Sequence, residues 1–292
     1  MEGNPNRMNP KDFRFFDRLR VRWAEVDMQR IVFNGHYLLY FDTAVGGYWR
    51  SLAMPYHETM EMLSGDLYVR KATLEYLASA HYDERLQVGI RCERIGNSSM
   101  RFVGCVFRGS QPLVTSELVY VFADPATQTS KPVPPTLRSV LEAFEAREPM
   151  ATMSLGSWDQ MAVTARALRH AVFVQELGIP AEIEADAADA QALHAVATNR
   201  FGMAVGTGRA VWTPDGNARI GRMAVLASVR GAGVGASLLA ALVGECRSRG
   251  AGEVMLHAQV DAIEFYRRHG FQARGPRFQE AGIEHQEMVL LP

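Results

Sequence analysis

The sequence predicts an α+β protein of two units, residues 1–148 and 157–292, joined by a linker over 149–156. In the first unit, one long helical stretch precedes four strand-like stretches, which is typical of an antiparallel sheet with a helix on one face. In the second unit, helical and strand-like stretches are mixed along the chain. The length of 292 residues also suits two domains.

The first unit begins with residues 13–26, where apolar and polar side chains alternate as in a strand. Residues 34–50 predict a helix, because apolar side chains recur there at spacings of three and four. This stripe consists of Tyr37, Leu38, Phe41, Ala44, Val45 and Tyr48. Gly46 and Gly47 lie within the stretch, so we expect its C-terminal end to fray. A shorter helix is expected over 56–63.

Four strands follow, separated by turn signals such as Gly96-Asn97-Ser98. They are expected over 67–77, 85–94, 100–108 and 113–123. A short charged helix over 136–145, preceded by prolines, completes the first unit.

The second unit is expected to begin with a helix over 159–176 and a strand over 193–198. The turn Pro214-Asp215-Gly216-Asn217 marks a hairpin. The remaining expected elements are the hairpin strands over 203–212 and 218–226, a helix over 235–249, a strand over 253–259, a helix over 262–269 and the final strands.

Charge and hydropathy exclude several classes of partner. The chain has 31 basic and 32 acidic residues, divided 18 to 18 before residue 151 and 13 to 14 after it. We therefore expect no nucleic-acid partner and no membrane-surface partner. No apolar run reaches the ~18 residues that a membrane span needs. Lys11 and Asp12 lie where a secretory signal would be apolar, so a cytoplasmic protein is expected.

Cysteine and histidine spacing predict no metal site. Cys92, Cys105 and Cys246 are an odd, widely spaced set without a Cys-x-x-Cys pair, which indicates neither a disulfide framework nor a zinc cage. The eight histidines show neither His-x-His nor His-Glu-x-x-His spacing. We expect no bound metal.

The most specific motif is the run Arg230-Gly231-Ala232-Gly233-Val234-Gly235, between an expected strand and an expected helix. Its glycines let successive N–H groups converge on an anion, and the helix N-terminus adds positive charge. The run therefore suits a pyrophosphate better than a simple tight turn. The glycine spacing differs from that of dinucleotide-binding loops, and the Gly-Lys-Ser/Thr of nucleoside-triphosphate loops is absent.

This run resembles the acyl-CoA pyrophosphate loop of the GNAT acetyltransferase superfamily, and the likeness covers roughly residues 157–292. Met223 and Val225 match the strand that offers backbone groups to the pantetheine arm in that family. Flanking segments, such as His257-x-Gln259, resemble its ElaA-like branch. The resemblance implies a mixed α/β GNAT domain that transfers an acyl group from CoA, such as the acetyl group of acetyl-CoA, to a small-molecule or peptide amine. The implied CoA-binding residues are Met223, Val225, Arg230, Gly231, Gly233, Gly235 and Ala236.

The same resemblance implies that Tyr266 is the general acid, which protonates the departing CoA thiolate. The alternative is that Tyr266 packs beside Phe265 in the core. The general base stays open, because any surface carboxylate can equally be a solvated charge. The candidates for this base are Glu176, Asp186, Glu280, Glu284 and His285. His194 and His257 are interpreted as core histidines.

Asp27 is the notable residue of the first unit. It lies at an expected strand end, seven residues before the long helix begins at Asn34. N–H groups at a helix start can polarise a carbonyl, and an adjacent carboxylate can attack that carbonyl or activate water. A thioester suits such a site because a thiolate leaves readily. The alternative is that Asp27 only caps the turn into the helix.

The stretch Asp27-Met28-Gln29-Arg30-Ile31-Val32-Phe33-Asn34 resembles the signature of hotdog-fold thioesterases of the 4-hydroxybenzoyl-CoA type, including the YbgC-like acyl-CoA thioesterases. The likeness spans roughly residues 14–145. It implies a hotdog fold (an antiparallel sheet wrapped on a central helix), Asp27 as the catalytic carboxylate and Asn34 as the helix start that supplies the polarising N–H. It also implies at least a homodimer, because the acyl pocket of that family forms between subunits.

Two positions depart from this family's pattern. Arg30 stands where glycine is usual, so the backbone there must avoid a positive φ or bear its cost. Asn34 stands where some relatives carry a histidine or an aromatic residue. Other residues that could meet the CoA phosphates, or simply be solvated, are Arg94, Ser98, Ser99 and Arg108.

The two resemblances together predict a bifunctional enzyme of CoA thioesters. Its first unit would pass an acyl group to water through Asp27, and its second unit would pass one to an amine with Tyr266 as acid. The alternative is a non-catalytic acyl-CoA-binding or sensing protein. Coenzyme A or acetyl-CoA, used as a substrate, is the only cofactor expected.

Overall fold

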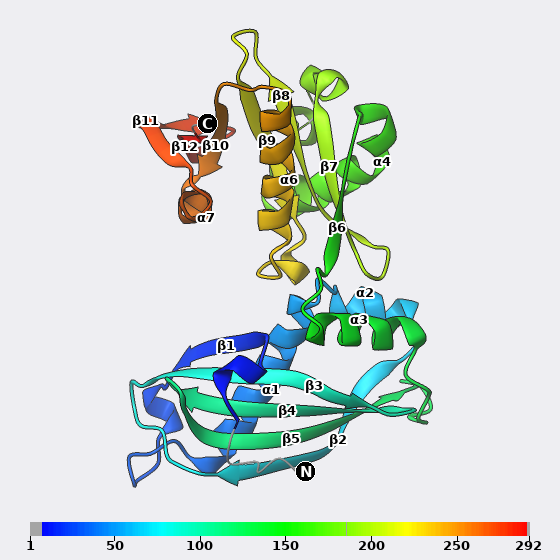
Figure 1. The fold of residues 1–292 in the computed structure, drawn as a ribbon, viewed down its shortest axis with the longest axis vertical. Coiled ribbons are helices and arrows are strands. Elements are labelled where there is room, and N and C mark those ends of the chain that lie inside the picture. The colour runs from blue at the N-terminus through cyan, green and yellow to red at the C-terminus, as the bar shows by residue number, and fades with distance from the viewer. Residues whose placement is uncertain (1–7, 185, 291–292) are drawn as a thin grey trace. The chain divides into compact units, whose positions relative to one another are not determined.

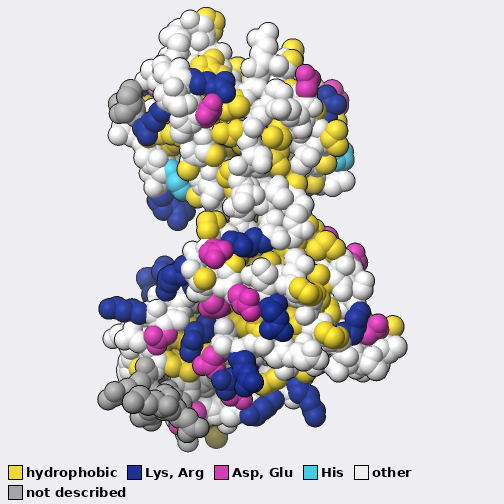
Figure 2. Space-filling view, turned by 45° about the vertical axis from the view of Figure 1, so that its right-hand side comes forward, with side chains coloured by type: hydrophobic (Ala, Val, Ile, Leu, Met, Phe, Trp, Pro, Cys, Tyr) yellow, Lys and Arg dark blue, Asp and Glu magenta, His cyan; other side chains and the backbone are white. Residues whose placement is uncertain are grey.

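The computed structural model describes residues 8–184 and 186–290. The chain divides into two compact units, residues 1–150 and 151–292, which are described separately below (Figure 1). In the described ranges, no helix is both long and apolar enough to cross a membrane. Basic and acidic side chains of the first unit are interspersed on the face shown in Figure 2.

The first unit is a five-stranded antiparallel sheet wrapped on one long helix, which confirms the predicted hotdog arrangement (Figure 1). The strand order is β1-β3-β4-β5-β2, and α1 packs against β1 and β3. The strands are β1 (Phe15–Arg20), β2 (Asp66–Tyr76), β3 (Arg85–Ile95), β4 (Ser99–Arg108) and β5 (Gln111–Ala123). The helices are α1 (Asn34–Ser51), α2 (Tyr56–Met62) and α3 (Pro135–Glu145).

Helix α1 forms because its apolar stripe is buried against the sheet. Tyr37, Phe41, Ala44, Val45 and Tyr48 of the predicted stripe are buried, whereas Leu38 is exposed. The expected fraying at Gly46 and Gly47 is wrong, since the helix continues to Ser51. A Cβ on Gly47 would lie 2.7 Å from the ring of Phe15, so the glycine is what allows the helix to approach β1.

The predicted strand over 13–26 is shorter in the structure. β1 ends at Arg20, and Trp23–Glu25 form a 3-10 turn. The buried Glu25 carboxylate accepts hydrogen bonds from the Tyr40 hydroxyl and the Arg22 backbone, both at 2.7 Å. These bonds draw the chain away from the sheet and toward α1, because a buried carboxylate needs such partners.

The second unit is a seven-stranded mixed sheet in the order β11-β12-β10-β9-β8-β7-β6, flanked by helices (Figure 1). All neighbouring strands are antiparallel except β9 and β10. The strands are β6 (Ala151–Gly156), β7 (Leu193–Asn199), β8 (Ala204–Trp212), β9 (Ala218–Val225), β10 (Val254–Gln259), β11 (Gln272–Glu280) and β12 (Ile283–Leu290). The helices are α4 (Trp158–Arg169), α5 (Ala181–Glu184), α6 (Val234–Ser248) and α7 (Ile263–Arg268).

Two expectations for this unit are corrected. Most of the expected linker over 149–156 is strand β6, because its backbone pairs with β7 from Ala151 opposite Asn199 to Gly156 opposite His194. The helix expected over 159–176 changes character after Arg169, and His170–Glu176 is a π-helix. Such π-helical turns are frequent at functional sites.

Candidate active sites

A cavity of about 620 Å³ in the first unit lies at the start of α1. Asp27 and Asn34, the two residues expected here from the sequence, both line it. Its wall is otherwise largely apolar, with contributions from β2 and the segment that follows it. Three of its apolar residues are exposed, namely Met28, Phe33 and Tyr76.

Asp27 lies in a tight turn between β1 and α1. Its Oδ1 accepts the N–H of Gln29 at 2.8 Å, and its own N–H donates to the Ile31 carbonyl at 2.9 Å. The residue preceding α1 is Phe33, which gives the helix no side-chain cap. Asp27 therefore caps the turn that leads into α1, as the alternative interpretation expects, and does not cap the helix itself.

The start of α1 offers polarising N–H groups to the same cavity. The N–H of His36 donates to the Phe33 carbonyl, whereas those of Asn34 and Gly35 precede any acceptor inside the helix. The Tyr76 hydroxyl donates to the Asn34 carbonyl at 3.2 Å and ties β2 to this helix start. A carbonyl in this cavity would lie between a carboxylate and the positive end of an 18-residue helix.

Arg30 takes the conformation that its family position normally gives to glycine, with φ of 62°. Its N–H closes the turn by donating to the Asp27 carbonyl at 2.9 Å. A left-handed backbone costs a non-glycine residue about 1–2 kcal/mol. The left-handed backbone of Arg30 therefore lowers the stability of the turn beside Asp27.

Replacing Arg30 with glycine is expected to stabilise the first unit by about 0.5–1 kcal/mol, because the left-handed strain is removed and part of the gain is offset by a freer unfolded chain. Chemical denaturation of the two proteins measures the difference. Arg30→Ala serves as the control, since it removes the same long side chain but keeps a Cβ. Equal stability of the glycine and alanine variants would contradict the strain.

The second unit contains a cavity of about 930 Å³ where β9 and β10 diverge. These strands pair only from Ala218 to Ile220 and from Val254 to Leu256. The cavity opens beyond these pairs, beside the N-terminus of α6. It is lined by all eight residues expected in this unit, namely Met223, Val225, Arg230, Gly231, Gly233, Gly235, Ala236 and Tyr266.

The glycine run turns the chain sharply into α6. Gly231 and Gly233 have φ of 92° and 84°, conformations that glycine adopts without strain, and Gly233 is the residue preceding the helix. No side chain caps this 15-residue helix at its start. Its first N–H groups lie at the cavity and can donate to an anion.

The Arg230 guanidinium is already engaged. It donates to both carboxylate oxygens of Glu176, at 2.5 and 2.7 Å, and its Nε donates to the Val225 carbonyl at 3.0 Å. Hydrogen bonding from Arg230 lowers the pKa of Glu176. Glu176, a candidate base in the sequence, is therefore a poor proton acceptor and instead fixes the arginine of the loop.

Tyr266 projects from α7 into this cavity and is largely buried. Its ring packs edge-on against Phe265 and Phe271, with centroids 5.0 and 5.9 Å away. Burial raises the pKa of Tyr266 to about 12, so the phenol keeps its proton at neutral pH. The residue is thus both packed and placed at the cavity, and a protonated phenol there can act as an acid.

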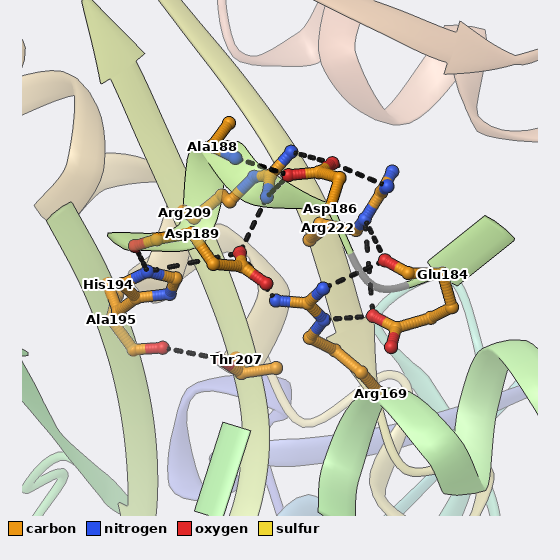
Figure 3. A network of polar contacts seen from close by, with 10 residues as sticks. All are labelled: Arg169, Glu184, Asp186, Ala188, Asp189, His194, Ala195, Thr207, Arg209 and Arg222. Atoms are coloured by element: carbon orange, nitrogen blue, oxygen red, sulfur yellow. Dashed lines mark hydrogen bonds and ion pairs between the residues drawn. The ribbon is translucent and has the colours of Figure 1, made fainter. Parts of the chain in front are cut away.

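A buried ion cluster supports the cavity wall at β9 (Figure 3). Arg169 and Arg209 are 1% and 5% exposed, and both donate to Asp189 Oδ1, at 2.9 and 2.5 Å. Asp186 receives two bonds from Arg209 at 2.6 Å and one from Arg222 at 2.9 Å. The cluster also includes Glu184, which is ion-paired with Arg169 and accepts from Arg222 through its carbonyl.

This cluster holds an irregular part of β9. Arg222 has φ of 53° and lies where β9 bulges opposite β8, next to Met223. The hydrogen bond from Arg209 lowers the pKa of Asp186 to about 2. Asp186 is therefore not an available base, which corrects another of the sequence candidates.

The histidines divide differently from the expectation. His194 is a core residue as expected, with its Nε2 3.0 Å from the Asp189 carbonyl and its ring against Trp158. His257 instead lines the cavity, with Nδ1 2.8 Å from Glu280 Oε2. Sequence reasoning named Glu280 as a candidate but did not pair it with His257.

The remaining candidates are less favourable. Glu284 is exposed, pairs with Arg277 and is not part of the cavity wall. His285 is buried, and its Nδ1 bonds to the Ile283 carbonyl. In the first unit, Arg108 forms an ion pair with Glu84. Among the described residues, no group of three or more His, Cys, Asp and Glu side chains could hold a metal ion.

Comparison with known families divides the chain as its fold does. Residues 29–115 match the family model described as the thioesterase superfamily. Residues 162–292 match the model described as the acetyltransferase (GNAT) domain.

Two relatives that are similar in sequence agree with these matches. The uncharacterized N-acetyltransferase YjcF of Bacillus subtilis is 37% identical over 124 residues, which is 42% of this chain and 86% of that protein. A protein of Aquifex aeolicus, named only provisionally as an esterase, is 31% identical over 94 residues, 32% of this chain and 73% of that protein. A thioesterase from Thermus thermophilus, solved with coenzyme A and zinc, is 23% identical; the match covers 47% of this chain and 98% of that one with a TM-score of 0.42.

Proposed function

The chain belongs to the thioesterase superfamily through its first unit and to the GNAT acetyltransferase family through its second, and on this premise we propose that it is a bifunctional enzyme of CoA thioesters. The first unit hydrolyses an acyl-CoA, and the second transfers an acyl group from CoA to an amine. The observation that carries this proposal is that each cavity gathers the residues expected for it.

In the hydrolysis, the thioester carbonyl lies at the start of α1, where the N–H groups of Asn34 and Gly35 stabilise the developing oxyanion. Asp27 either attacks the carbonyl carbon, which gives an anhydride that water then cleaves to regenerate the carboxylate, or removes a proton from the attacking water. The C–S bond breaks, and the thiolate leaves with a proton from solvent. The apolar wall of the cavity supports binding of the acyl group.

In the transfer, the CoA pyrophosphate lies on the N–H groups of the glycine run and the start of α6. The backbone of Met223 and Val225 lines the path of the pantetheine arm along the open edge of β9. The acceptor nitrogen attacks the carbonyl carbon and loses one proton, the C–S bond breaks, and Tyr266 protonates the thiolate. Solvent returns the proton lost by the nitrogen to the tyrosinate.

Replacing Tyr266 with phenylalanine is expected to lower kcat for transfer about 10²-fold, because the leaving thiolate loses its acid. The affinity for CoA is expected to change little, since the ring packing is kept. The measurement is amine-dependent thiol release from acetyl-CoA over a broad amine panel. A thiol reagent can report it, because the protein's three cysteines are buried and burial raises the pKa of their thiols.

Tyr82→Phe is the matched control, because Tyr82 is an exposed tyrosine of the first unit outside both cavities. Unchanged transfer in Tyr266→Phe would remove Tyr266 from the acid role. Binding of CoA without any turnover would favour the sensing alternative over the enzyme.

We also propose that a second copy of the chain covers the first cavity. Met28, Phe33 and Tyr76 line that cavity and are 102%, 51% and 52% exposed. Apolar groups gathered in this way around a site are typical of a surface that another subunit covers. Sedimentation of the intact chain would show a monomer if this were wrong.

A further inference from the structure

The second cavity contains a histidine–carboxylate pair that the steps above do not use. His257 on β10 and Glu280 on β11 both line the cavity, and the His257 Nδ1 lies 2.8 Å from Glu280 Oε2. The His257 side chain is 23% exposed, so it is partly shielded and still reachable. The partners are 23 residues apart in sequence, and their side chains meet although β12 lies between their strands in the sheet.

This contact fixes which imidazole nitrogen is free. A carboxylate accepts hydrogen bonds, so Nδ1 is the donor to Glu280, and in the neutral imidazole the lone pair is then on Nε2. Nε2 has no hydrogen-bond partner within the described residues. The ring of Phe278 packs edge-on against His257 at 4.8 Å and limits its rotation. The arrangement is that of a base held by a carboxylate.

The other candidate bases of this unit are engaged in contacts of their own, so none of them competes with His257 as the proton acceptor. Arg230 occupies Glu176, and Arg209 and Arg222 occupy Asp186. His285 has no carboxylate partner in the part of the chain that is described, and its ring stacks on Phe278. Charged and titratable side chains lie on each element around His257. They are Arg219 on β9, Arg268 on α7, Glu280 on β11, and His285 and Glu287 on β12. Glu287 forms an ion pair with Arg274.

We propose that His257 is the general base of the acyl transfer and that Glu280 is the residue that positions it, an inference that rests on the proposed transferase function. As the neutral amine attacks, the C–N bond forms and Nε2 of His257 takes one proton from the nitrogen. The C–S bond then breaks, and the thiolate takes the proton of Tyr266. Water carries the proton of the imidazolium back to the tyrosinate, so the products are the amide and the free thiol.

The test replaces His257 with glutamine in the intact chain. Amine-dependent thiol release is expected to fall about 10²–10³-fold in kcat, because the base is lost, while CoA binding measured by calorimetry stays within a factor of three. His170→Gln is the matched control, since His170 is exposed and does not line the cavity. Full transfer activity in His257→Gln would overturn the assignment.

Glu280→Gln provides a second test that does not depend on the first variant folding. Loss of the carboxylate is expected to lower kcat about tenfold and to leave KM for acetyl-CoA within a factor of three, because the imidazole is no longer held in the orientation and tautomer that the base needs. Glu284→Gln, on the same hairpin and outside the cavity wall, should leave kcat unchanged. An unchanged kcat in Glu280→Gln would overturn the positioning role.

The wild-type assay separates this inference from the proposed function. If the wild-type chain shows no amine-dependent release with any amine, the transferase proposal and this inference both fall. If the wild type transfers and the His257 and Glu280 variants transfer equally well, only the inference falls.

Discussion

Replacing Asp27 with asparagine is expected to lower acyl-CoA hydrolysis by about 10³-fold. Asparagine keeps the size of the side chain and an oxygen that can accept the N–H of Gln29, so the turn is retained. It removes the negative charge that attacks the carbonyl or accepts a proton from water. The measurement is thiol release from a panel of acyl-CoAs without added amine.

Asp42→Asn is the matched control, because Asp42 is exposed on α1 and does not line the cavity. Amine-dependent transfer by the second unit should be unchanged in Asp27→Asn, and an unchanged unfolding transition of the first unit shows that the mutated unit is folded. Hydrolysis within threefold of the wild type would remove Asp27 from the reaction.

Replacing Asp189 with asparagine is expected to destabilise the second unit by about 3–5 kcal/mol. Asp189 is 4% exposed, and its Oδ1 accepts from both Arg169 and Arg209. Removing its charge leaves the buried cluster with an excess of positive charge. Calorimetry of thermal unfolding should show a lower stability for the transition of the second unit only. The variant should also retain hydrolysis at a temperature where it has lost transfer.

Asp159→Asn is the control for this change, because Asp159 is exposed in the first turn of α4 and should cost less than about 0.5 kcal/mol. An Asp189 variant as stable as the control would show that the cluster contributes little to the fold.

The contribution of Asp186 in this cluster to the stability of the second unit depends on pH. The pKa of Asp186 is lowered to about 2 in the folded protein, below its usual value near 3.9. Its contribution to stability is therefore complete above about pH 4 and is lost as the pH falls toward 2. Asp186 is partly exposed, so solvent screening reduces the size of the effect.

Local features of both sites could be predicted from the sequence. The helix start at Asn34 and the glycine run before α6 depend on residues close together in the chain, and the structure places both as expected. The sequence shows that a positive φ at Arg30 would cost stability, but it does not show whether the backbone adopts that conformation. The surrounding turn determines this.

Contacts between distant residues could not be predicted. Arg230 and Glu176 are 54 positions apart, and nothing in either local sequence selects the partner. His257 is expected in the core from the sequence, because a lone histidine on a strand usually packs there, and only the folded structure shows its contact with Glu280, 23 residues away. The sequence predicts a linker over 149–156, because an edge strand such as β6 is identified only by its pairing with β7.

Titration of the intact wild-type chain with coenzyme A, followed by calorimetry, tests the central claim most directly. If each unit binds coenzyme A, the titration should give a stoichiometry of two CoA molecules per chain. A stoichiometry of one would contradict the claim for one of the units, and the absence of any binding of CoA or its esters would contradict it for both.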